Sequence, residues 1–404
     1  GGLALAYPED SGDLARAVHR CTGVGACLAD GSAHDGVMCP SYLATREEKD
    51  STRGRARVLQ EVVRGALDWS APEVHDALDL CLSCKACASE CPTGIDMAAY
   101  KSEVLHQTYA GRRRPRSHYA LGQLPRWTRL VGLAPRLANA ALARPGVRRL
   151  VLQTAGLDAR RRMPRFAAKP FTRGFVAAPG AGRPVVLFVD TFSDSFSPAV
   201  ASAAVALLRD AGYEPRLPTG RVCCGLTWIT TGQLDAAKRI LGETVRTLAA
   251  AADGGVPIVA LEPSCTAVLR REVDDLLPED DAARVVAGAV RTLAELLLDT
   301  PGWSPPDLSG VEVVAQPHCH HHAVLGWEAD AALLRRAGAR VQRVSGCCGM
   351  AGNFGMEEGH YDVSVAVAGR HLLPALDARP DAVVLADGFS CRTQSEDLRG
   401  RPAA

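Results

Sequence analysis

The sequence predicts an α + α/β protein, in which a small all-α domain precedes two α/β repeats with parallel sheets. First, the N-terminal quarter combines dense cysteines with apolar residues at helical spacing. Second, buried strand patterns alternate with helical patterns from Arg183 onward. Third, Cys-Cys-Gly occurs twice, each time followed at a similar distance by a single cysteine. The predicted domains are residues 1–110 (all-α), 111–182 (basic helical linker), 183–305 (first repeat) and 306–404 (second repeat).

The cysteines of residues 81–92 have the spacing of iron–sulfur ligands. They form the pattern C-x2-C-x2-C-x3-C-P, in which three thiolates bind one [4Fe–4S] cluster and the fourth reaches a second cluster, as in bacterial ferredoxins. Zinc sites usually use two separated C-x2-C pairs, and cysteines grouped at such short range do not suit disulfides in a chain of cytosolic, enzyme-like size. The run therefore predicts a ferredoxin-type domain with two clusters.

A partner motif with the spacing C-x5-C-x11-C-P precedes this run. If the ligands cross over between motifs, one site is complete and the other lacks a ligand. The complete four-iron site consists of Cys39, Cys81, Cys84 and Cys87, and the incomplete site of Cys21, Cys27 and Cys91.

Val24 stands where the missing ligand is expected. An apolar residue at this corner resembles the iron–sulfur subunit of succinate dehydrogenase, and that resemblance implies a [3Fe–4S] cluster. The other interpretation is a four-iron cluster completed by water or by Asp30, His34 or Asp35, although these three residues also suit an ordinary solvated loop.

Three helices are expected around the clusters. One follows Ser51 or Thr52, either of which can cap its first free amides. A second precedes Cys81, and a third covers about 96–109.

The composition is that of a globular protein, with 404 residues, 47% hydrophobic residues and a net charge of +1. No apolar run reaches the length of a membrane span, and the first residues do not form a leader pattern. We therefore expect a cytoplasmic location. The first residue is Gly1 rather than Met, which favours a segment of a longer polypeptide.

The balanced charge conceals a strongly basic stretch at 112–173, with fifteen arginines, one lysine and one acidic residue, Asp158. Apolar residues alternate with the arginines at helical spacing, and we expect Pro125 and Pro135 to break the helices. This segment suits peripheral contact with anionic lipid at the inner face of a membrane, or an acidic partner. It equally suits a linker packed on the acidic body of the chain. Nucleic acid is not expected, because no base-stacking aromatic pattern accompanies the charge.

The two repeats share an order of elements. Strands are expected at 185–190, 257–262, 311–315 and 382–386, and helices at 199–211, 233–251, 328–337 and 359–376. Cys265 follows the first Cys-Cys-Gly and Cys391 follows the second. These cysteines should lie at strand ends, where parallel sheets place their ligands.

The repeats resemble the cysteine-rich CCG domains of heterodisulfide reductase, of the anaerobic glycerol-3-phosphate dehydrogenase iron–sulfur subunit, and of glycolate and lactate oxidation complexes. Other motifs are similar to the C-terminal half of fused FAD-linked oxidase/iron–sulfur oxidoreductases; they occupy 21–27, 38–42, 51–56, 318–322, 346–352 and 386–391. The resemblance implies that a flavin domain or subunit outside this chain oxidises a D-2-hydroxy acid such as D-lactate, glycolate or D-2-hydroxyglutarate.

A full CCG domain has a lone cysteine, a Cys-Cys pair and a C-x2-C. The second repeat retains Cys319, Cys347, Cys348 and Cys391, with Gly388 at the first place of C-x2-C, and we expect it to bind a third cluster or zinc. The first repeat retains Cys223, Cys224 and Cys265, with Thr191 near the lone-cysteine place and Glu262 at the first place of C-x2-C. It is a weaker metal site, and simple burial of its cysteines is the competing interpretation.

The resemblance implies transfer of electrons from a flavin through the clusters to a quinone or a carrier protein. Two other functions stay open: a reductase with its own active-site cluster in the second repeat, and a zinc-stabilised docking module. His318, His320, His321 and His322, beside Cys319, suit metal binding, proton transfer or hydrogen bonding to a quinone, or an ordinary surface run of histidines.

Overall fold

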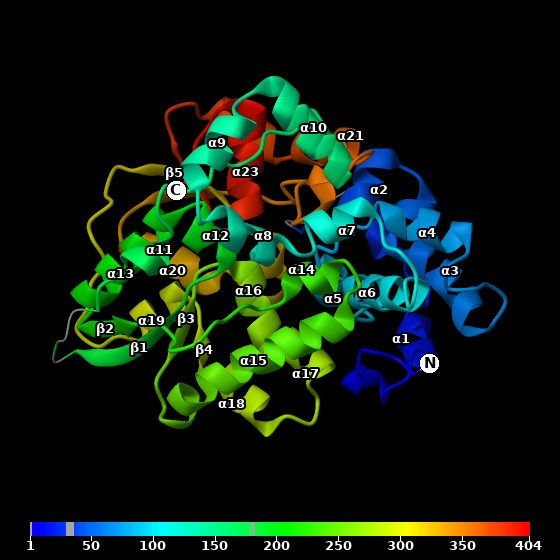
Figure 1. Ribbon diagram of the computed structural model, residues 1–404, viewed down its shortest axis with the longest axis horizontal. Coiled ribbons are helices and arrows are strands. Elements are labelled where there is room, and N and C mark those ends of the chain that lie inside the picture. The colour runs from blue at the N-terminus through cyan, green and yellow to red at the C-terminus, as the bar shows by residue number, and fades with distance from the viewer. Residues whose placement is uncertain (1, 30–35, 178–179, 181) are drawn as a thin grey trace.

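The computed structural model describes residues 2–29, 36–177, 180 and 182–404 (Figure 1). The three predicted N-terminal helices are present as α3 (Thr52–Val63), α4 (Pro72–Asp79) and α6 (Met97–Thr108). Ser51 and Asp96 cap α3 and α6 by accepting backbone N–H groups. The prediction missed α1 (Leu14–His19), α2 (Pro40–Thr45) and α5 (Ala86–Glu90), because helices of five or six residues are too short to show a periodic pattern.

The basic segment folds as a series of short helices, and the predicted breaks near Pro125 and Pro135 are present. The helices are α7 (Arg116–Ala120), α8 (Leu124–Val131), α9 (Pro135–Leu142), α10 (Pro145–Ala155) and α11 (Phe171–Gly174). Pro125 and Pro135 lie in the first turns of α8 and α9. At that position no intrahelical bond needs the missing N–H, so proline starts the helix.

The first repeat contains a four-stranded parallel sheet in the order β2-β1-β3-β4. Its strands are β1 (Arg183–Phe188), β2 (Tyr213–Arg216), β3 (Ile258–Ala260) and β4 (Val290–Arg291). The helices between and after them are α12 (Thr191–Ser195), α13 (Pro198–Asp210), α14 (Leu226–Thr230), α15 (Leu234–Asp253), α16 (Pro263–Ala267), α17 (Val273–Leu276), α18 (Asp281–Ala289) and α19 (Leu293–Leu298).

The second repeat has a three-stranded parallel sheet in the order β6-β5-β7, so the predicted parallel sheets are confirmed. Its strands are β5 (Glu312–Gln316), β6 (Arg340–Arg343) and β7 (Val383–Ala386). Its helices are α20 (Glu328–Arg336), α21 (Tyr361–Ala368), α22 (Leu372–Ala378) and α23 (Phe389–Arg399). The single helix expected over 359–376 is instead two, because α21 ends at Ala368 and Gly369 follows.

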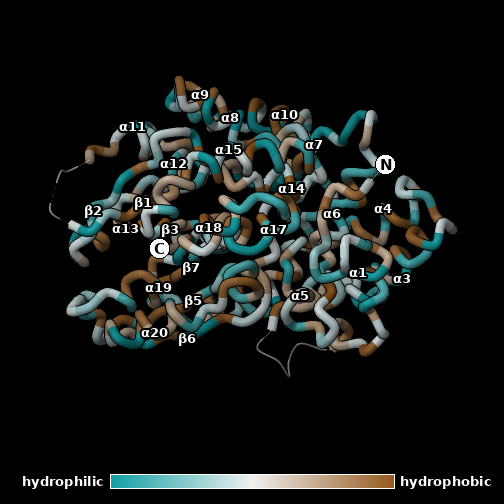
Figure 2. Tube along the Cα trace, turned by 90° about the horizontal axis from the view of Figure 1, so that it is seen from below, coloured by the Kyte–Doolittle hydropathy of each residue, from teal (hydrophilic) through white to brown (hydrophobic). Residues whose placement is uncertain are grey.

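One hydrophobic core joins the N-terminal domain to the first repeat. Leu59 and Tyr100 belong to the same buried cluster as Trp228 and Leu241. Among the described residues, no helix combines the length and hydropathy needed to cross a membrane. The basic helices α9 and α10 lie along one edge of the molecule in both overall views, and α8 lies beside them at that edge in Figure 2 (Figures 1 and 2).

Candidate functional site

A small buried cavity brings together the four cysteines predicted to form the complete cluster site. Cys39, Cys81, Cys84 and Cys87 line it, and each is less than a tenth exposed. Cys39 immediately precedes α2, Cys81 and Cys84 lie between α4 and α5, and Cys87 lies in α5. The predicted crossing of ligands requires that cysteines of both motifs lie around one cavity. Four thiolate donors around one cavity suit a four-iron cluster.

A buried guanidinium lies beside this cavity. Arg55 is 1% exposed, and its Nη1 lies 3.6 Å from Cys39 Sγ. Its remaining nitrogens donate to Ser41 Oγ at 2.9 Å and to the Ala77 carbonyl at 2.8 Å. Burial raises the pKa of the Cys84 and Cys87 thiols, so forming thiolates here requires compensating positive charge. Arg55 supplies part of that charge, and bound iron would supply the rest.

The three cysteines of the incomplete site lie in more exposed surroundings. Cys27 is buried, whereas Cys21 and Cys91 are partly exposed. The backbone N–H of Arg53 donates to Cys27 Sγ at 3.3 Å. Val24 is 63% exposed, so its side chain does not occupy a buried corner. Asp30, His34 and Asp35, which were proposed to complete the site, lie outside the described residues.

The four cysteines of the second repeat form a continuous chain of sulfur contacts. Cys347 contacts Cys319 and Cys348, and Cys348 also contacts Cys391. The contacts with Cys347 and Cys391 lower the pKa of Cys348. Contact with Cys319, and then with Cys348, raises the pKa of Cys347, and contact with Cys348 raises that of Cys391. Within the described ranges, no group of three or more His, Cys, Asp or Glu side chains is arranged to hold a single metal ion.

Gly388 stands where a full CCG domain has a cysteine, and the structure explains the substitution. A Cβ atom at Gly388 would collide with the imidazole of His318. The ring therefore fills the space that a cysteine side chain would need.

The three cysteines of the first repeat also lie together. The Sγ atoms of Cys224 and Cys265 are 2.9 Å apart, and Cys223 contacts Cys224. Glu262, at the place of the missing cysteine, is 3% exposed and accepts hydrogen bonds from Ser264 Oγ and from the backbone N–H of Phe389. Burial and the nearby Asp190 raise the pKa of Glu262 to about 8.

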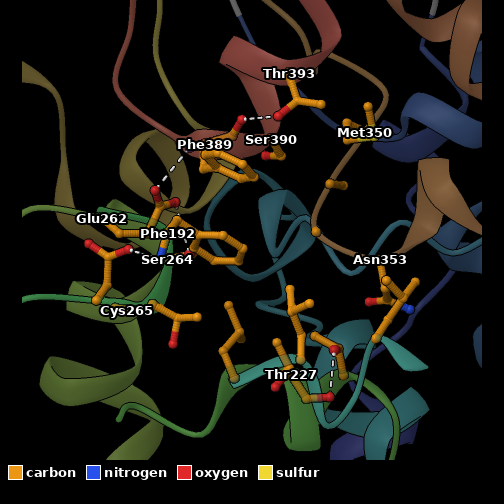
Figure 3. A pocket seen from close by; sticks show the side chains of 18 of the residues that line it. Phe192, Thr227, Glu262, Ser264, Cys265, Met350, Asn353, Phe389, Ser390 and Thr393 are labelled. Carbon is orange, nitrogen blue, oxygen red and sulfur yellow. Dashed lines mark hydrogen bonds between the residues drawn. The ribbon is translucent and has the colours of Figure 1, made fainter. Parts of the chain in front are cut away.

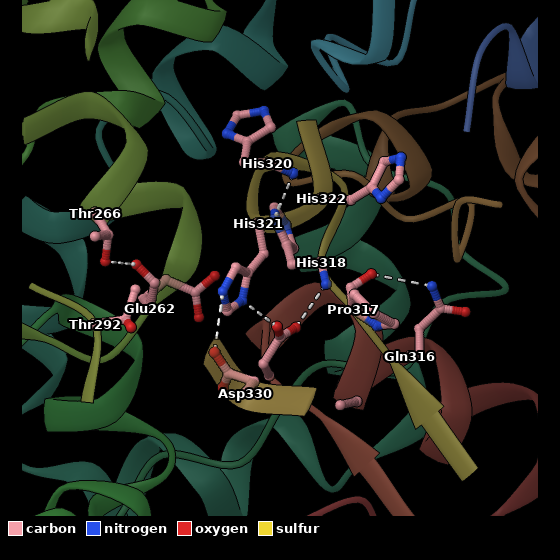
Figure 4. A network of polar contacts seen from close by, with 12 residues as sticks. Glu262, Thr266, Thr292, Gln316, Pro317, His318, His320, His321, His322 and Asp330 are labelled. Carbon is pink, nitrogen blue, oxygen red and sulfur yellow. Dashed lines mark hydrogen bonds and ion pairs between the residues drawn. The ribbon is translucent and has the colours of Figure 1, made fainter. Parts of the chain in front are cut away.

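Three of the four histidines of the run are buried and His322 is partly exposed, which excludes an ordinary surface run of histidines. His318, His320 and His321 are each less than 5% exposed. His321 lies between Asp387, at 2.6 Å, and Asp330, at 3.3 Å (Figure 4). Burial lowers the pKa of His321, but its hydrogen bonds to both carboxylates outweigh that effect and raise the pKa to about 10.

Two of these histidines connect the second repeat to the N-terminal domain. His320 Nε2 lies 2.9 Å from the carbonyl oxygen of Ser83, between two predicted cluster ligands. His322 Nε2 lies 3.0 Å from Glu90 Oε1. Burial and His318 lower the pKa of His320 to about 3, so this ring is neutral at physiological pH. A neutral imidazole can donate a hydrogen bond to the Ser83 carbonyl.

A larger, mostly apolar cavity lies between the two repeats (Figure 3). The segments that follow β1, β3 and β5 all reach it, through Asp190, Glu262 and His318. The rings of Phe192 and Phe389, which line it, stack directly on one another with centroids 4.7 Å apart. Phe389 lies within the motif at 386–391, whereas Phe192 lies outside every motif, because a single phenylalanine after a strand carries no spacing signal.

Comparisons with known proteins agree with this arrangement. Residues 17–95 match the family described as "4Fe-4S dicluster domain", and this range contains all seven cysteines of the first two motifs. Residues 188–270 and 327–394 match the family described as "Cysteine-rich domain". The chain is an iron–sulfur protein.

Similar proteins include dehydrogenases and subunits of dehydrogenases and of a probable oxidase. The chain is 27% identical to D-2-hydroxyglutarate dehydrogenase of Pseudomonas putida, over 96% of this chain and 42% of that protein. It is 27% identical to one subunit of the anaerobic glycerol-3-phosphate dehydrogenase of Escherichia coli, over 64% of this chain and 67% of that protein. It is 24% identical to the probable glycolate oxidase iron–sulfur subunit of Bacillus subtilis, over 86% of this chain and 81% of that protein. The chain thus spans less than half the length of the D-2-hydroxyglutarate dehydrogenase.

Proposed function

We propose that this iron–sulfur protein is the electron-transfer module of an FAD-dependent D-2-hydroxy-acid dehydrogenase of the lactate, glycolate or 2-hydroxyglutarate class. The flavin belongs to a separate domain or subunit, and the final acceptor is a quinone or a carrier protein. The similarity to a D-2-hydroxyglutarate dehydrogenase over 96% of this chain supports the substrate class.

The observation that carries this proposal is the continuity between the cysteine cavity and the two repeats. Leu82 and Ser83 line both the cavity of the four predicted ligands and the cavity between the repeats. Cys84 belongs to the same buried cluster as Cys319 and Cys347. Sulfur groups therefore extend from one domain into the next without an intervening layer of solvent.

A bound iron–sulfur cluster would supply single-electron transfer, with a potential set by hydrogen bonds, charge and exposure. Cys39, Cys81, Cys84 and Cys87 would hold the four-iron cluster, and Cys21, Cys27 and Cys91 the second cluster. Arg55 places a permanent charge beside the first site and hydrogen-bonds to the surrounding backbone. Burial of the four thiols excludes water from that site.

A second candidate function is favoured by the chain of contacts among Cys319, Cys347, Cys348 and Cys391. These residues would form the active-site cluster of a heterodisulfide-reductase-like enzyme. Their proximity to Cys84 favours redox chemistry over a purely structural site, because it joins them to the electron path.

We also propose a cytoplasmic location with peripheral contact between residues 112–173 and the inner face of the membrane. Among the described residues, thirteen large hydrophobic side chains are exposed, and eight of them lie in this basic segment. They are Tyr119, Trp127, Leu130, Leu133, Leu137, Val147, Leu150 and Val151. Exposed apolar side chains among arginines are typical of helices that lie in a lipid interface.

Electron paramagnetic resonance of anaerobically purified protein, with iron and sulfide measured on the same sample, tests the main proposal. We expect a reduced four-iron signal after dithionite that is lost in Cys84→Ser and retained in Cys223→Ser, which serves as a control outside the cysteine cavity. Absence of iron from the wild-type protein, or an unchanged signal in Cys84→Ser, would overturn the proposal.

The oxidised sample decides the type of the second cluster. A three-iron cluster is paramagnetic when oxidised, so its signal should be present as isolated and lost in Cys91→Ser. A silent oxidised sample that shows two four-iron signals on reduction would instead mean that another group completes the site beside Val24.

A further inference from the structure

The cavity between the repeats has features of a binding site for a flat, mainly apolar molecule. Phe192 of α12 and Phe389 of α23 stack with their ring planes only 16° apart. Met350 and Thr227 line other parts of the same cavity (Figure 3). Aromatic rings and a thioether favour contact with another ring system.

Among the residues that line this cavity, the buried polar atoms without a hydrogen-bond partner in the described part of the chain include Asp190 Oδ2 and Ser390 Oγ. Asp190 is 3% exposed and Ser390 is 8% exposed. The other carboxylate oxygen of Asp190 is already used, because it accepts the N–H groups of Phe192 and Ser193. An unpaired buried polar atom costs free energy, so both atoms indicate a ligand that carries hydrogen-bonding groups.

Residues of the basic segment form part of the wall of this cavity. Leu121, Leu124, Pro125, Met163, Pro164 and Phe166 line the cavity. The same segment exposes Trp127 and Leu130 to the exterior. An apolar ligand between these residues would lie directly beneath the surface proposed to contact the membrane.

We propose that this cavity binds a quinone, with its ring beside Phe192 and Phe389 and its oxygen substituents toward Ser390 and Asp190. The assignment rests on the proposed function and chooses the quinone over the carrier protein as the acceptor. In the complete reaction, the 2-hydroxy acid loses two electrons and two protons to become the 2-oxo acid. The quinone gains two electrons and two protons to become the quinol, and the protons exchange with solvent.

Each polar group has a role in one oxidation state of the ligand. The Ser390 hydroxyl can donate to a carbonyl oxygen of the quinone. The free oxygen of Asp190 can accept a hydrogen bond from a hydroxyl of the quinol. The shared lining residues Leu82 and Ser83 place the ligand one layer of residues away from the cysteine cavity.

Titration calorimetry with decylubiquinone on the full chain tests the assignment without any turnover. We expect saturable binding to the wild-type protein, and binding about five- to tenfold weaker in Ser390→Ala, because one buried hydrogen bond is lost. Asp190→Asn should weaken binding of the quinol more than binding of the quinone, and Asn retains the cap of α12. Ser202→Ala, in an exposed side chain of α13, is the matched control.

An alkylbenzene with the same chain but no oxygen atoms is the second control, and it should bind much more weakly than the quinone. Absence of quinone binding, equal binding of the alkylbenzene, or unchanged binding in both Ser390→Ala and Asp190→Asn would overturn the assignment. Spectra and iron content of the same samples separate the two proposals. Intact cluster signals without quinone binding reject this site and leave the electron-transfer function standing.

Discussion

Arg55 is the residue on which the charge balance of the cysteine cavity depends. Its side chain is buried, and its Nη1 lies 3.6 Å from Cys39 Sγ. It also donates hydrogen bonds to the Ser41 hydroxyl and the Ala77 carbonyl. A positive charge near a cluster stabilises the more negative, reduced form. A buried charge also acts more strongly than an exposed one, because solvent screens it less.

Replacing Arg55 with Gln should lower the reduction potential of the four-iron cluster. Gln keeps hydrogen-bond donors at this position but removes the charge. We expect a decrease on the order of 60 mV, which corresponds to about 1.4 kcal/mol for one electron. A potentiometric titration followed by electron paramagnetic resonance measures this value.

Arg57→Gln is the control for that measurement, because Arg57 lies on the same helix and is exposed. The reduction potential of the cluster in this variant should stay close to that in the wild-type protein. Equal potentials for all three proteins would contradict the role assigned to Arg55.

At the scale of single residues, the sequence predicts those neighbours that follow from the spacing of the cysteines. The cysteine spacing predicted that Cys39 would join Cys81, Cys84 and Cys87, and these four residues line one cavity. Spacing does not encode which side chains from distant segments fill a gap. The imidazole of His318 beside Gly388, and the approach of Glu262 to the backbone of Phe389, depend on tertiary packing across the two repeats.

At the scale of elements, the basic segment shows how proline divides a helical pattern, since Pro125 and Pro135 each lie in the first turn of a new helix. Its arginines divide between buried and exposed positions. Arg161 is buried and pairs with Asp397, so it attaches the segment to the second repeat. Arg136 and Arg149 are exposed beside Leu137 and Leu150. The segment is therefore an attached layer with an amphipathic outer surface.

The double variant Leu133→Asp/Leu137→Asp should bind anionic vesicles at least about tenfold more weakly than the wild-type protein. These side chains are 73% and 75% exposed, so their replacement removes apolar contact with lipid and adds negative charge without disturbing the core. Co-sedimentation with phosphatidylcholine vesicles, with and without phosphatidylglycerol, measures the binding. Val285→Asp, at an exposed position of α18, is the control. Binding that is equal for both variants would assign the segment to an internal linker.

The buried side chain of His118, in α7, should make the stability of the protein depend on pH. Burial, together with Arg114 and Lys101, lowers the pKa of His118 to about 3, below its ordinary value of 6.5. The unfolded chain therefore binds a proton between these pH values while the folded chain does not, so His118 lowers stability as the pH falls from 6.5 toward 3.

His118→Asn should remove this dependence. Urea unfolding at pH 5 and at pH 7.5 should show a wild-type protein that loses more stability on acidification than the variant does, by up to about 1.4 kcal/mol per pH unit. The same pH dependence in both proteins would mean that His118 is protonated in the folded chain.

At the scale of the whole molecule, the N-terminal domain and the first repeat share more than a hydrophobic core. Lys85, next to the predicted ligand Cys84, is buried, and its Nζ lies 2.7 Å from Asp96 and 3.7 Å from Glu272 of the first repeat. Burial raises the pKa of Glu272, and Lys85 opposes that shift. The ion pair thus joins two domains across their interface and holds two carboxylates close together.

The parallel sheets of the two repeats were predictable, because strand and helix patterns alternate twice with the same cysteine order. Their mutual arrangement was not, because the contacts that set it are single pairs such as Phe192 with Phe389. Such pairs leave no periodic signal in either repeat.

A double-mutant cycle on Lys85 and Glu272 tests whether the two domains are energetically coupled. Lys85→Met should lower the free energy of unfolding by about 3 kcal/mol or more, because the buried Glu272 and the partly exposed Asp96 lose their counter-charge. Glu272→Gln should cost less, since Lys85 keeps Asp96. The double variant should then be more stable than the sum of the single effects predicts, by about 1 kcal/mol. Lys49→Met breaks an exposed pair with Asp76, so it should cost no more than about 1 kcal/mol. Anaerobic urea unfolding measures all four variants, and strictly additive effects of Lys85 and Glu272 would show that the interface ion pair does not couple the domains.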